Sequence, residues 1–184
     1  MSKELPIDGL KGMTPKQQRH FRRSRRMLTR FPQTPRLFAL AHRTIFRLTG
    51  GGLGGTMQGT PIGLLTTTGR RSGRTRTVPI GYTDDDSRFL VAASNFGLDS
   101  PPAWYLNLRA HPNAEFHTRA GVERVVAREL TDLEREELWL GLLKDHPVWG
   151  ACQSCTERQI AIVALERHTV SRRGASSRIG RVHR

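Results

Sequence analysis

One segment constrains the fold of this chain more than any other, the run LLTTTGRRSGRTRTVPI from Leu64 to Ile80. Two runs rich in Thr, Val, Ile and Leu flank a short turn that contains Gly69 and Gly73. Glycine adopts the left-handed conformations that tight turns require, and the flanking residues favour extended backbone. The segment therefore predicts a β-hairpin and an antiparallel sheet.

The turn of this hairpin also carries a concentration of positive charge. Arg70, Arg71, Arg74 and Arg76 lie in or beside it, together with the hydroxyl of Ser72. Guanidinium groups bind phosphate and carboxylate in bidentate fashion and stay charged at any working pH. The turn is therefore a candidate anion receptor, and a solvated basic turn without a ligand remains the alternative.

The charge of the chain is unevenly distributed. The whole chain of 184 residues has a formal net charge of +14. Residues 1–30 carry nine Lys or Arg against two acidic residues, and residues 167–184 carry six Arg and no acidic residue. The remaining segment, 31–166, has a net charge of only +1. A nucleic-acid partner would have to use the two tails, and we disfavour it for the central segment.

Past the hairpin, the chain reads as short strands and helices. Three acids at Asp84–Asp86 indicate a turn, and a capping box from Thr131 to Glu134 starts a helix. The expected stripe of this helix facing the core is Leu133, Leu138, Trp139 and Leu142. Further strands are expected at 88–95, 114–119, 121–130 and 159–166, and a short helix at 103–111. About six antiparallel strands predict an α+β, mainly β fold, a small split β-barrel with flanking helices.

The N-terminal part reads as basic helices. Thr14 and Pro15 begin one helix, and Thr34 and Pro35 begin a second. The apolar face expected for the second helix consists of Leu37, Phe38, Leu40, Ala41, Ile45 and Leu48. It can pack on the core, which we favour, or lie on an anionic membrane surface.

Three regions follow from this pattern. Residues 1–55 form a basic helical extension ending in a glycine-rich loop, 56–167 form the barrel domain, and 168–184 form a basic tail expected to be disordered. The chain shows neither a signal peptide nor a run of ~20 apolar residues, which indicates a cytoplasmic protein with peripheral membrane contact as an open alternative. Cys152, Cys155 and His146 are too few for a metal site, so no metal is predicted.

Four ordered blocks within Gly59–Glu166 resemble a known family. They are the arginine hairpin, VAASN, PAWYLNLRAHPN and the ending QSCTER with IAIVALE. They are similar to the actinobacterial deazaflavin-dependent nitroreductase and quinone reductase family, which has a split β-barrel fold and uses reduced coenzyme F-420. The resemblance implies an oxidoreductase that transfers a hydride to a quinone, a nitro compound or an activated enone.

The resemblance also implies the site. The phosphodiester and polyglutamate tail of the coenzyme would meet Arg70, Arg71, Ser72 and Arg76, with the backbone of Thr77, Val78, Pro79 and Ile80 beside its ring system. Ala93, Ser94 and Asn95 would meet the phosphate or the ring edge, and Trp104, Tyr105 and Asn107 would form the other wall. Ser94 is the candidate catalytic group, as a proton or hydrogen-bond donor to the acceptor. The acceptor pocket would comprise Gly81, His146, Trp149 and Cys152, with Trp149 also near the cofactor.

The chain departs from the pattern of the nitroimidazole-reducing members at these positions. Those members carry lysine where this chain has Asn95, and tyrosines at the four positions of the acceptor pocket. Use of the cofactor is therefore a stronger prediction than nitroimidazole reduction. A flavin mononucleotide enzyme on a similar barrel, or a non-catalytic protein that binds nucleic acid or membranes through its basic tails, remain alternatives.

Overall fold

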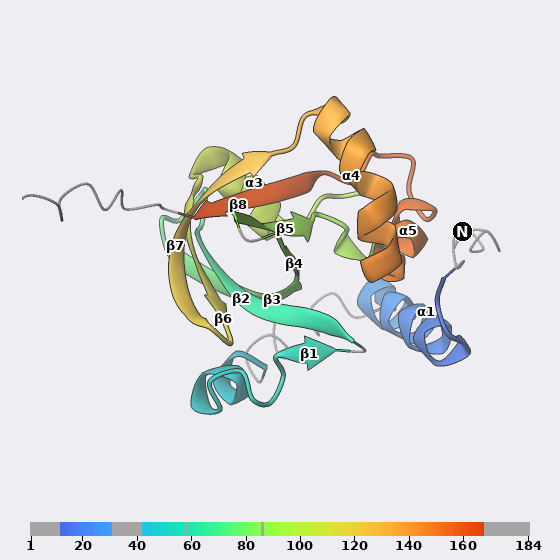
Figure 1. Ribbon diagram of the computed structural model, residues 1–184, viewed down its shortest axis with the longest axis horizontal. Coiled ribbons are helices and arrows are strands. Elements are labelled where there is room, and N and C mark those ends of the chain that lie inside the picture. Colours follow the sequence, from blue (N-terminus) through green and yellow to red (C-terminus); the bar gives the residue numbers. More distant parts are fainter. Residues whose placement is uncertain (1–11, 31–41, 58, 86, 168–184) are drawn as a thin grey trace, which may run out of the picture.

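The sheet of this protein is antiparallel throughout and strongly curled. The computed structural model describes residues 12–30, 42–57, 59–85 and 87–167. Figure 1 shows the curled sheet with helices on its outer side. The strands are β1 (Thr56–Met57), β2 (Thr60–Thr68), β3 (Thr75–Gly81), β4 (Thr83–Asp84), β5 (Arg88–Ala92), β6 (Asn113–Thr118), β7 (Gly121–Glu129) and β8 (Ile162–Arg167). The helices are α1 (Pro15–Arg30), α3 (Ala103–Ala110), α4 (Asp132–Asp145) and α5 (Pro147–Gln153), and residues 42–48 are also helical.

One bent segment links the two edges of the curled sheet. The strand order is β1-β2-β6-β7-β8-β5-β4, and β3 pairs with β2. β3 continues through Tyr82 into β4, which pairs with β5. The Tyr82 ring packs edge-on against Phe89 and Phe116. The segment from β3 to β4 therefore turns the sheet into a barrel, which confirms the predicted fold class.

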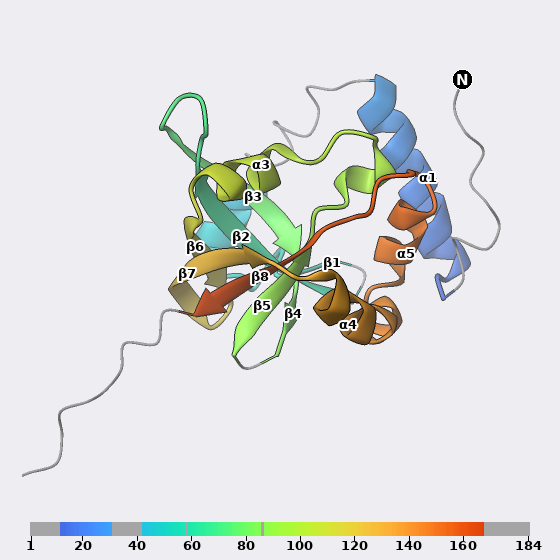
Figure 2. The same ribbon diagram turned by 90° about the horizontal axis from the view of Figure 1, so that it is seen from above.

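Side chains of β5 and β8 alternate between two apolar cores. Phe89, Val91, Val163 and Leu165 point into the barrel, where they join Leu65, Phe116 and Val125. Leu90, Ala92, Ile162 and Ala164 point outward, and α1, α4 and α5 cover them. Figure 2 shows these helices together on one side of the sheet. The period of two along a strand thus builds an inner and an outer core from the same strands.

Glycine at position 63 makes room for an aromatic ring inside the barrel. Gly63 lies on β2, and a Cβ atom there would overlap the ring of Phe116. Phe116 is fully buried and also contacts Phe89, at a centroid distance of 4.8 Å. Because glycine has no side chain, it leaves the space inside the barrel that the Phe116 ring fills.

Two helices begin with the caps predicted from the sequence. The Thr14 hydroxyl accepts a hydrogen bond from the Gln17 backbone N–H at the start of α1. At the start of α4, Thr131 and Glu134 form a reciprocal capping box. Glu134 also pairs with Arg128 of β7 at 2.8 Å, and so ties the helix to the sheet.

Two expectations about buried helix faces are wrong. Ile45 and Leu48 are 47% and 82% exposed, and Phe46 is the buried residue of helical segment 42–48. The Phe46 ring packs edge-on against His117 of β6, which selects the buried face. Leu37, Phe38, Leu40 and Ala41, with the start of this helix, lie outside the described residues. Leu133, expected in the core stripe of α4, is 74% exposed.

Three further points complete the comparison with the sequence. The six long strands are those expected, and β1 and β4 are additional pairs of two residues each. The predicted tail, 168–184, lies outside the described residues. Within the described part of the chain, no helix is long and apolar enough to cross a membrane.

Candidate functional site

The arginine hairpin projects beyond the barrel. β2 and β3 pair in register from Ile62–Gly81 to Thr68–Thr75, as the sequence predicts. The turn closes through a hydrogen bond from the Gly69 N–H to the Arg74 carbonyl at 2.9 Å, and Gly73 has a φ of +63°. Figure 2 shows the turn extending past the neighbouring strands.

The arginines of this turn lack ion-pair partners within the described part of the chain. Arg70, Arg71, Arg74 and Arg76 are all exposed, and no carboxylate of the described residues forms an ion pair with any of them. The Ser72 hydroxyl accepts a hydrogen bond from the Arg74 N–H at 3.4 Å. Four unpaired cations on a protruding turn suit a ligand with several negative charges.

A buried asparagine fixes the turn against α3. The Asn107 side chain accepts a hydrogen bond from the Arg70 N–H at 3.1 Å and donates one to the Thr67 hydroxyl at 3.1 Å. Tyr105 is also buried, and its hydroxyl donates to Glu129 at 2.7 Å. Both residues, predicted as the cofactor wall, are therefore engaged with protein groups. Trp104 is half-buried beside them.

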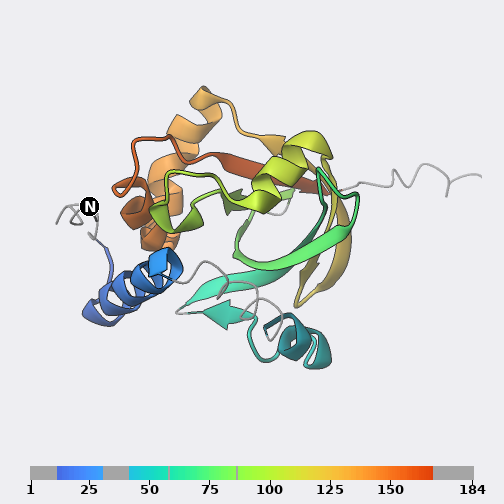
Figure 3. The same cartoon turned by 180° about the vertical axis from the view of Figure 1, so that it is seen from behind.

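Trp104 packs at the edge of the inner core together with residues of β3. Val78, Ile80 and Trp104 pack on the inner core from its rim, and Pro79 lies between the first two. Figure 3 shows β3 running beneath α3 and the segment that leads into it. The structure therefore brings the predicted ring-binding backbone of Thr77–Ile80 and the predicted wall to one end of the barrel.

The loop after β5 has an unusual backbone. Asn95 and Phe96 adopt left-handed φ angles of 45° and 54°. Ala93, the first residue after β5, is fully buried, and Ser94 and Asn95 are partly exposed. Consecutive left-handed residues other than glycine are uncommon and cluster at functional sites.

Arg158, from the loop before β8, holds this loop. Its Nη2 donates to the carbonyls of Ala93 and Ser94 at 3.0 and 2.9 Å, and its Nε donates to the carbonyl of Leu98 at 3.0 Å. Burial lowers the pKa of its guanidinium. Arg158 is the last residue of the QSCTER block, and the sequence alone predicts no role for it.

The four residues of the predicted acceptor pocket are linked in space. His146 lies between α4 and α5, and its Nε2 is 2.7 Å from the Thr83 hydroxyl, two residues after Gly81. The His146 ring stacks on Trp149 at a centroid distance of 4.3 Å. One turn further along α5, the backbone of Cys152 lies against the loop after β5, because a Cβ atom at Gly97 would come within 2.5 Å of the Cys152 carbonyl oxygen. A continuous strip thus joins the end of β3, α5 and the loop after β5.

The strip is mostly covered by the protein. Trp149, Cys152 and His146 are 5%, 2% and 2% exposed. The Nδ1 atom of His146 is buried and has no hydrogen-bond partner among the described residues. Burial lowers the pKa of His146, and burial raises the pKa of Cys152 to about 12. The imidazole is neutral at pH 7 and the thiol is protonated, so neither is an ionised group at neutral pH.

Two other features lie apart from this strip. A cavity of about 260 Å³ on the outer barrel surface is lined by Arg47, Leu64, Thr66, Glu115, His117 and Val122.

In the described part of the chain, no cluster of three His, Cys, Asp or Glu side chains could hold a metal ion. Cys152 and Cys155 are free and buried.

Comparison with known proteins identifies the family. The model of the F420H2-dependent quinone reductase family matches residues 39–167, which includes the hairpin, the loop after β5 and α5. The chain belongs to this family. It is therefore a reductase that depends on coenzyme F-420, with the reduced coenzyme as its cofactor.

Individual relatives agree with this assignment. An F420H2-dependent quinone reductase of Mycobacterium tuberculosis is 32% identical over 130 residues, which cover 68% of this chain and 87% of that protein. A solved F-420-dependent reductase is 34% identical, with a TM-score of 0.53, over 58% of this chain and 94% of that one. A second solved structure, described as a domain-swapped dimer, is 30% identical with a TM-score of 0.55, over 69% of this chain and 97% of that one.

Proposed function

We propose that this reductase transfers a hydride from reduced coenzyme F-420 to a quinone, and that the arginine hairpin binds the anionic end of the coenzyme. The observation that carries the proposal is the protruding turn whose four arginines have no acidic partner in the described chain. A guanidinium without a carboxylate partner keeps its donors for a ligand. The family match supports the quinone as acceptor.

Each part of the coenzyme has a group of suitable chemistry in this arrangement. Arg70, Arg71, Ser72 and Arg76 would hold the phosphodiester and polyglutamate tail. The backbone of Thr77–Ile80 would lie beside the ring system, opposite Ala93, Ser94 and Asn95. Trp104 would close the site, while buried Tyr105 and Asn107 keep α3 and the turn in place.

The bound coenzyme supplies the hydride, that is, both electrons and one of the two hydrogens that convert a quinone to a hydroquinone. The residues of this chain orient the acceptor and deliver or admit the second proton. We assign the contact with the acceptor oxygen to the Ser94 hydroxyl, which is partly exposed. Gly81, His146, Trp149 and Cys152 would shape the acceptor pocket, and their burial would exclude water from it.

Binding and turnover test the proposal together. The protein is titrated with oxidised and reduced coenzyme F-420, and oxidation of the reduced form by menadione is then followed. A deazaflavin chromophore without the phosphodiester and tail is the control, and it should bind at least tenfold more weakly. No saturable binding at tens of micromolar would refute the proposal. A tightly bound yellow flavin in the purified protein would favour the flavin mononucleotide alternative.

A second proposal concerns an anionic membrane surface, the source of lipid-soluble quinones. Ile45, Leu48 and Leu53 are exposed apolar residues of the helical segment 42–48 and its following loop. α1 exposes Lys16, Arg19, Arg22 and Arg23. Figure 1 shows α1 and the 42–48 helix along the same lower side of the molecule. Exposed apolar side chains and a basic helix on the same side of the molecule match a negatively charged lipid surface.

Vesicle flotation tests this contact. Vesicles with anionic lipid should carry the protein and zwitterionic ones should not, and Ile45→Ser with Leu48→Ser should reduce binding severalfold. Leu140→Ser is the matched control, because Leu140 is 71% exposed on α4. Equal flotation with both vesicle types, or an equal loss in the control, would contradict membrane contact.

A further inference from the structure

We infer that Arg158 is a positioning residue, whose guanidinium fixes the loop after β5 in the conformation that presents Ser94 and Asn95 to the coenzyme. The hydrogen bonds of Arg158 support its effect on the loop, and the expected effect on coenzyme binding rests on the proposed function. Neither the sequence nor the comparisons assign a role to this arginine.

The loop needs an external support. Asn95 and Phe96 have left-handed φ angles, and Gly97 follows with a φ of +71°. A left-handed backbone conformation is unfavourable for a residue other than glycine. The strained pair is partly open to solvent, since the Phe96 side chain is 39% exposed. The loop would relax if nothing fixed it.

Arg158 supplies this support on both sides of the strained pair. Its hydrogen bonds to Ala93 and Ser94 lie before the pair, and its bond to Leu98 lies after it. One planar guanidinium therefore sets the separation of three carbonyl groups. Lysine, with a single nitrogen, cannot reproduce this geometry.

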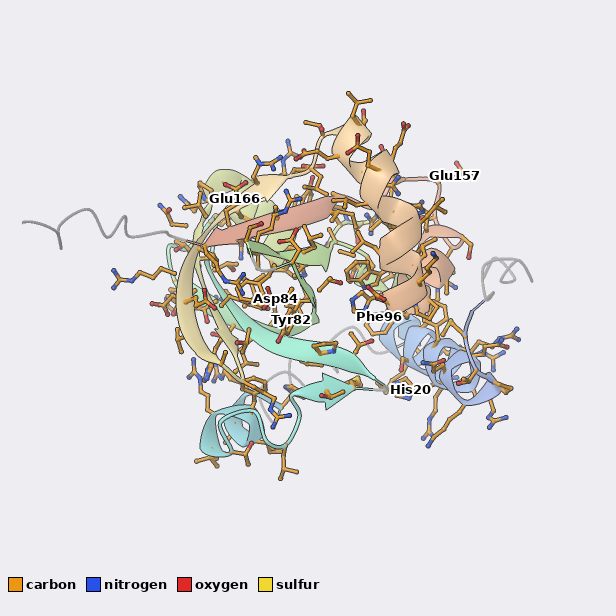
Figure 4. All side chains as sticks on the ribbon, in the orientation of Figure 1. His20, Tyr82, Asp84, Phe96, Glu157 and Glu166 are labelled. Carbon is orange, nitrogen blue, oxygen red and sulfur yellow. The ribbon has the colours of Figure 1, made fainter. Side chains whose placement is uncertain are left out.

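Neighbouring groups limit the alternatives for the loop. A Cβ atom at Gly97 would lie 2.5 Å from the Cys152 carbonyl oxygen, so the loop sits tightly against α5. The Asn95 side chain donates to the Ser100 carbonyl at 2.9 Å. Phe96 stacks on Phe21 of α1 at a centroid distance of 6.5 Å, and Figure 4 shows it between the α4–α5 region and α1. These contacts leave the loop one conformation as long as Arg158 holds its carbonyls.

The hydrogen bonds of the Arg158 guanidinium go to backbone carbonyls of this loop. No carboxylate of the described residues forms an ion pair with it, and burial lowers its pKa. A half-buried cation whose hydrogen bonds go to backbone carbonyls stabilises one backbone geometry. The geometry that it stabilises includes Ser94 and Asn95, the two loop residues that the proposed site needs.

The experiment compares Arg158→Lys and Arg158→Met with Arg135→Lys and Arg135→Met. Arg135 is a matched control, since it is also half-buried and donates to a backbone carbonyl, that of Ile160 at 3.3 Å. Hydrogen exchange of the loop amides is measured in the protein without coenzyme, and the Kd for the oxidised coenzyme by its fluorescence. The melting temperature of every variant is recorded.

Both Arg158 variants should speed hydrogen exchange in residues 94–98 without a matching change in α4. Both should also raise the Kd for the coenzyme tenfold or more, and the increase should be smaller for Arg158→Lys than for Arg158→Met. The Arg135 variants should lower the melting temperature and leave both readouts near wild type. Wild-type loop exchange in Arg158→Lys would overturn the inference, and so would a Kd that rises equally in the Arg135 variants. If the wild type binds no coenzyme, the proposed function fails, and loop exchange alone decides the role of Arg158. If Arg158→Met does not fold, Arg158→Lys decides.

Discussion

His146 has the most unusual surroundings of any described side chain in the candidate site. It is buried, it has one ring nitrogen without a partner, and its other nitrogen contacts the Thr83 hydroxyl. A buried polar atom without a partner normally lowers stability, and such atoms need an explanation. A ligand oxygen at Nδ1 would supply the missing partner, in line with our proposal that His146 shapes the acceptor pocket.

Acid should destabilise the protein through this residue. Burial lowers the pKa of His146 in the folded state, while the unfolded chain keeps the ordinary value of about 6.5. The unfolded state therefore takes up the proton first, and the free energy of unfolding falls as the pH drops below about 6.5 until the folded pKa is passed. His146→Gln should remove part of this slope between pH 7.5 and 5.5, as measured by urea denaturation. The exposed His111→Gln is the control, and equal slopes in both variants would contradict the prediction.

Removing arginines from the turn should weaken binding of the coenzyme. Replacing Arg70 and Arg71 by Ala should raise its Kd roughly 10- to 100-fold, because a hydrogen bond to a charged group contributes about 1.5–3 kcal/mol. The loss should shrink at high salt, since the arginines are exposed. Isothermal titration checks this, with the exposed Arg124→Ala of β7 as the charge-matched control. An equal effect in the control would indicate a general loss of positive charge.

Helix α4 shows how far local sequence determines an element. Its start follows from the Thr131 to Glu134 pattern, which the structure contains as a capping box. Thr131→Ala should lower the free energy of unfolding by about 1 kcal/mol. The exposed Glu136→Ala on the same helix is the comparison, and urea denaturation measures both. A smaller loss for Thr131→Ala than for Glu136→Ala would show that the cap contributes little.

The packing of strand β2 against Phe116 requires glycine at position 63. Gly63→Ala places a methyl group against the Phe116 ring, so it should cost about 1–3 kcal/mol of stability. Gly141→Ala on α4 is the control, because a Cβ atom there meets nothing. The control should stabilise slightly, since alanine favours helix. Thermal melts distinguish the two, and equal melting temperatures would exclude the steric conflict.

The sequence predicts this fold where the signal is local. The hairpin follows from Gly69, Gly73 and alternating residues, and the caps follow from Thr131 and its partner. The buried face of segment 42–48 does not, because His117, far along the chain, selects Phe46 instead of Ile45.

Part of the candidate site can likewise be predicted from local sequence, and the rest depends on contacts between residues far apart in the chain. Its chemistry is readable from the arginine turn and from the resemblance. Thr83 and Arg158 were missed, since a threonine beside a distant histidine and an arginine that binds only carbonyls leave no pattern in sequence. Pro147, at the first position of α5, was the available signal for that helix.

At the scale of the whole molecule, the two cores should unfold together. β5 and β8 contribute alternate side chains to the inner and outer cores, so neither core can form without these strands. Phe116→Ala should remove about 3–5 kcal/mol from the inner core. Tryptophan fluorescence, to which Trp139 and Trp149 of the outer core contribute, should then shift to the same lower midpoint as far-ultraviolet circular dichroism. Val122→Ala, at an exposed position of β7, is the control, and separate midpoints would contradict a single cooperative unit.

The bent segment from β3 to β4 has a consequence for behaviour at high concentration. An open sheet edge presents unpaired N–H and C=O groups to which another molecule can add a strand. Because this segment pairs with β2 on one side and with β5 on the other, it covers sheet edges with the chain's own backbone. The bend at Tyr82, labelled near the centre of Figure 4, therefore leaves the second side of β3, which pairs only with β2 among the described strands, as the edge to which another chain could add.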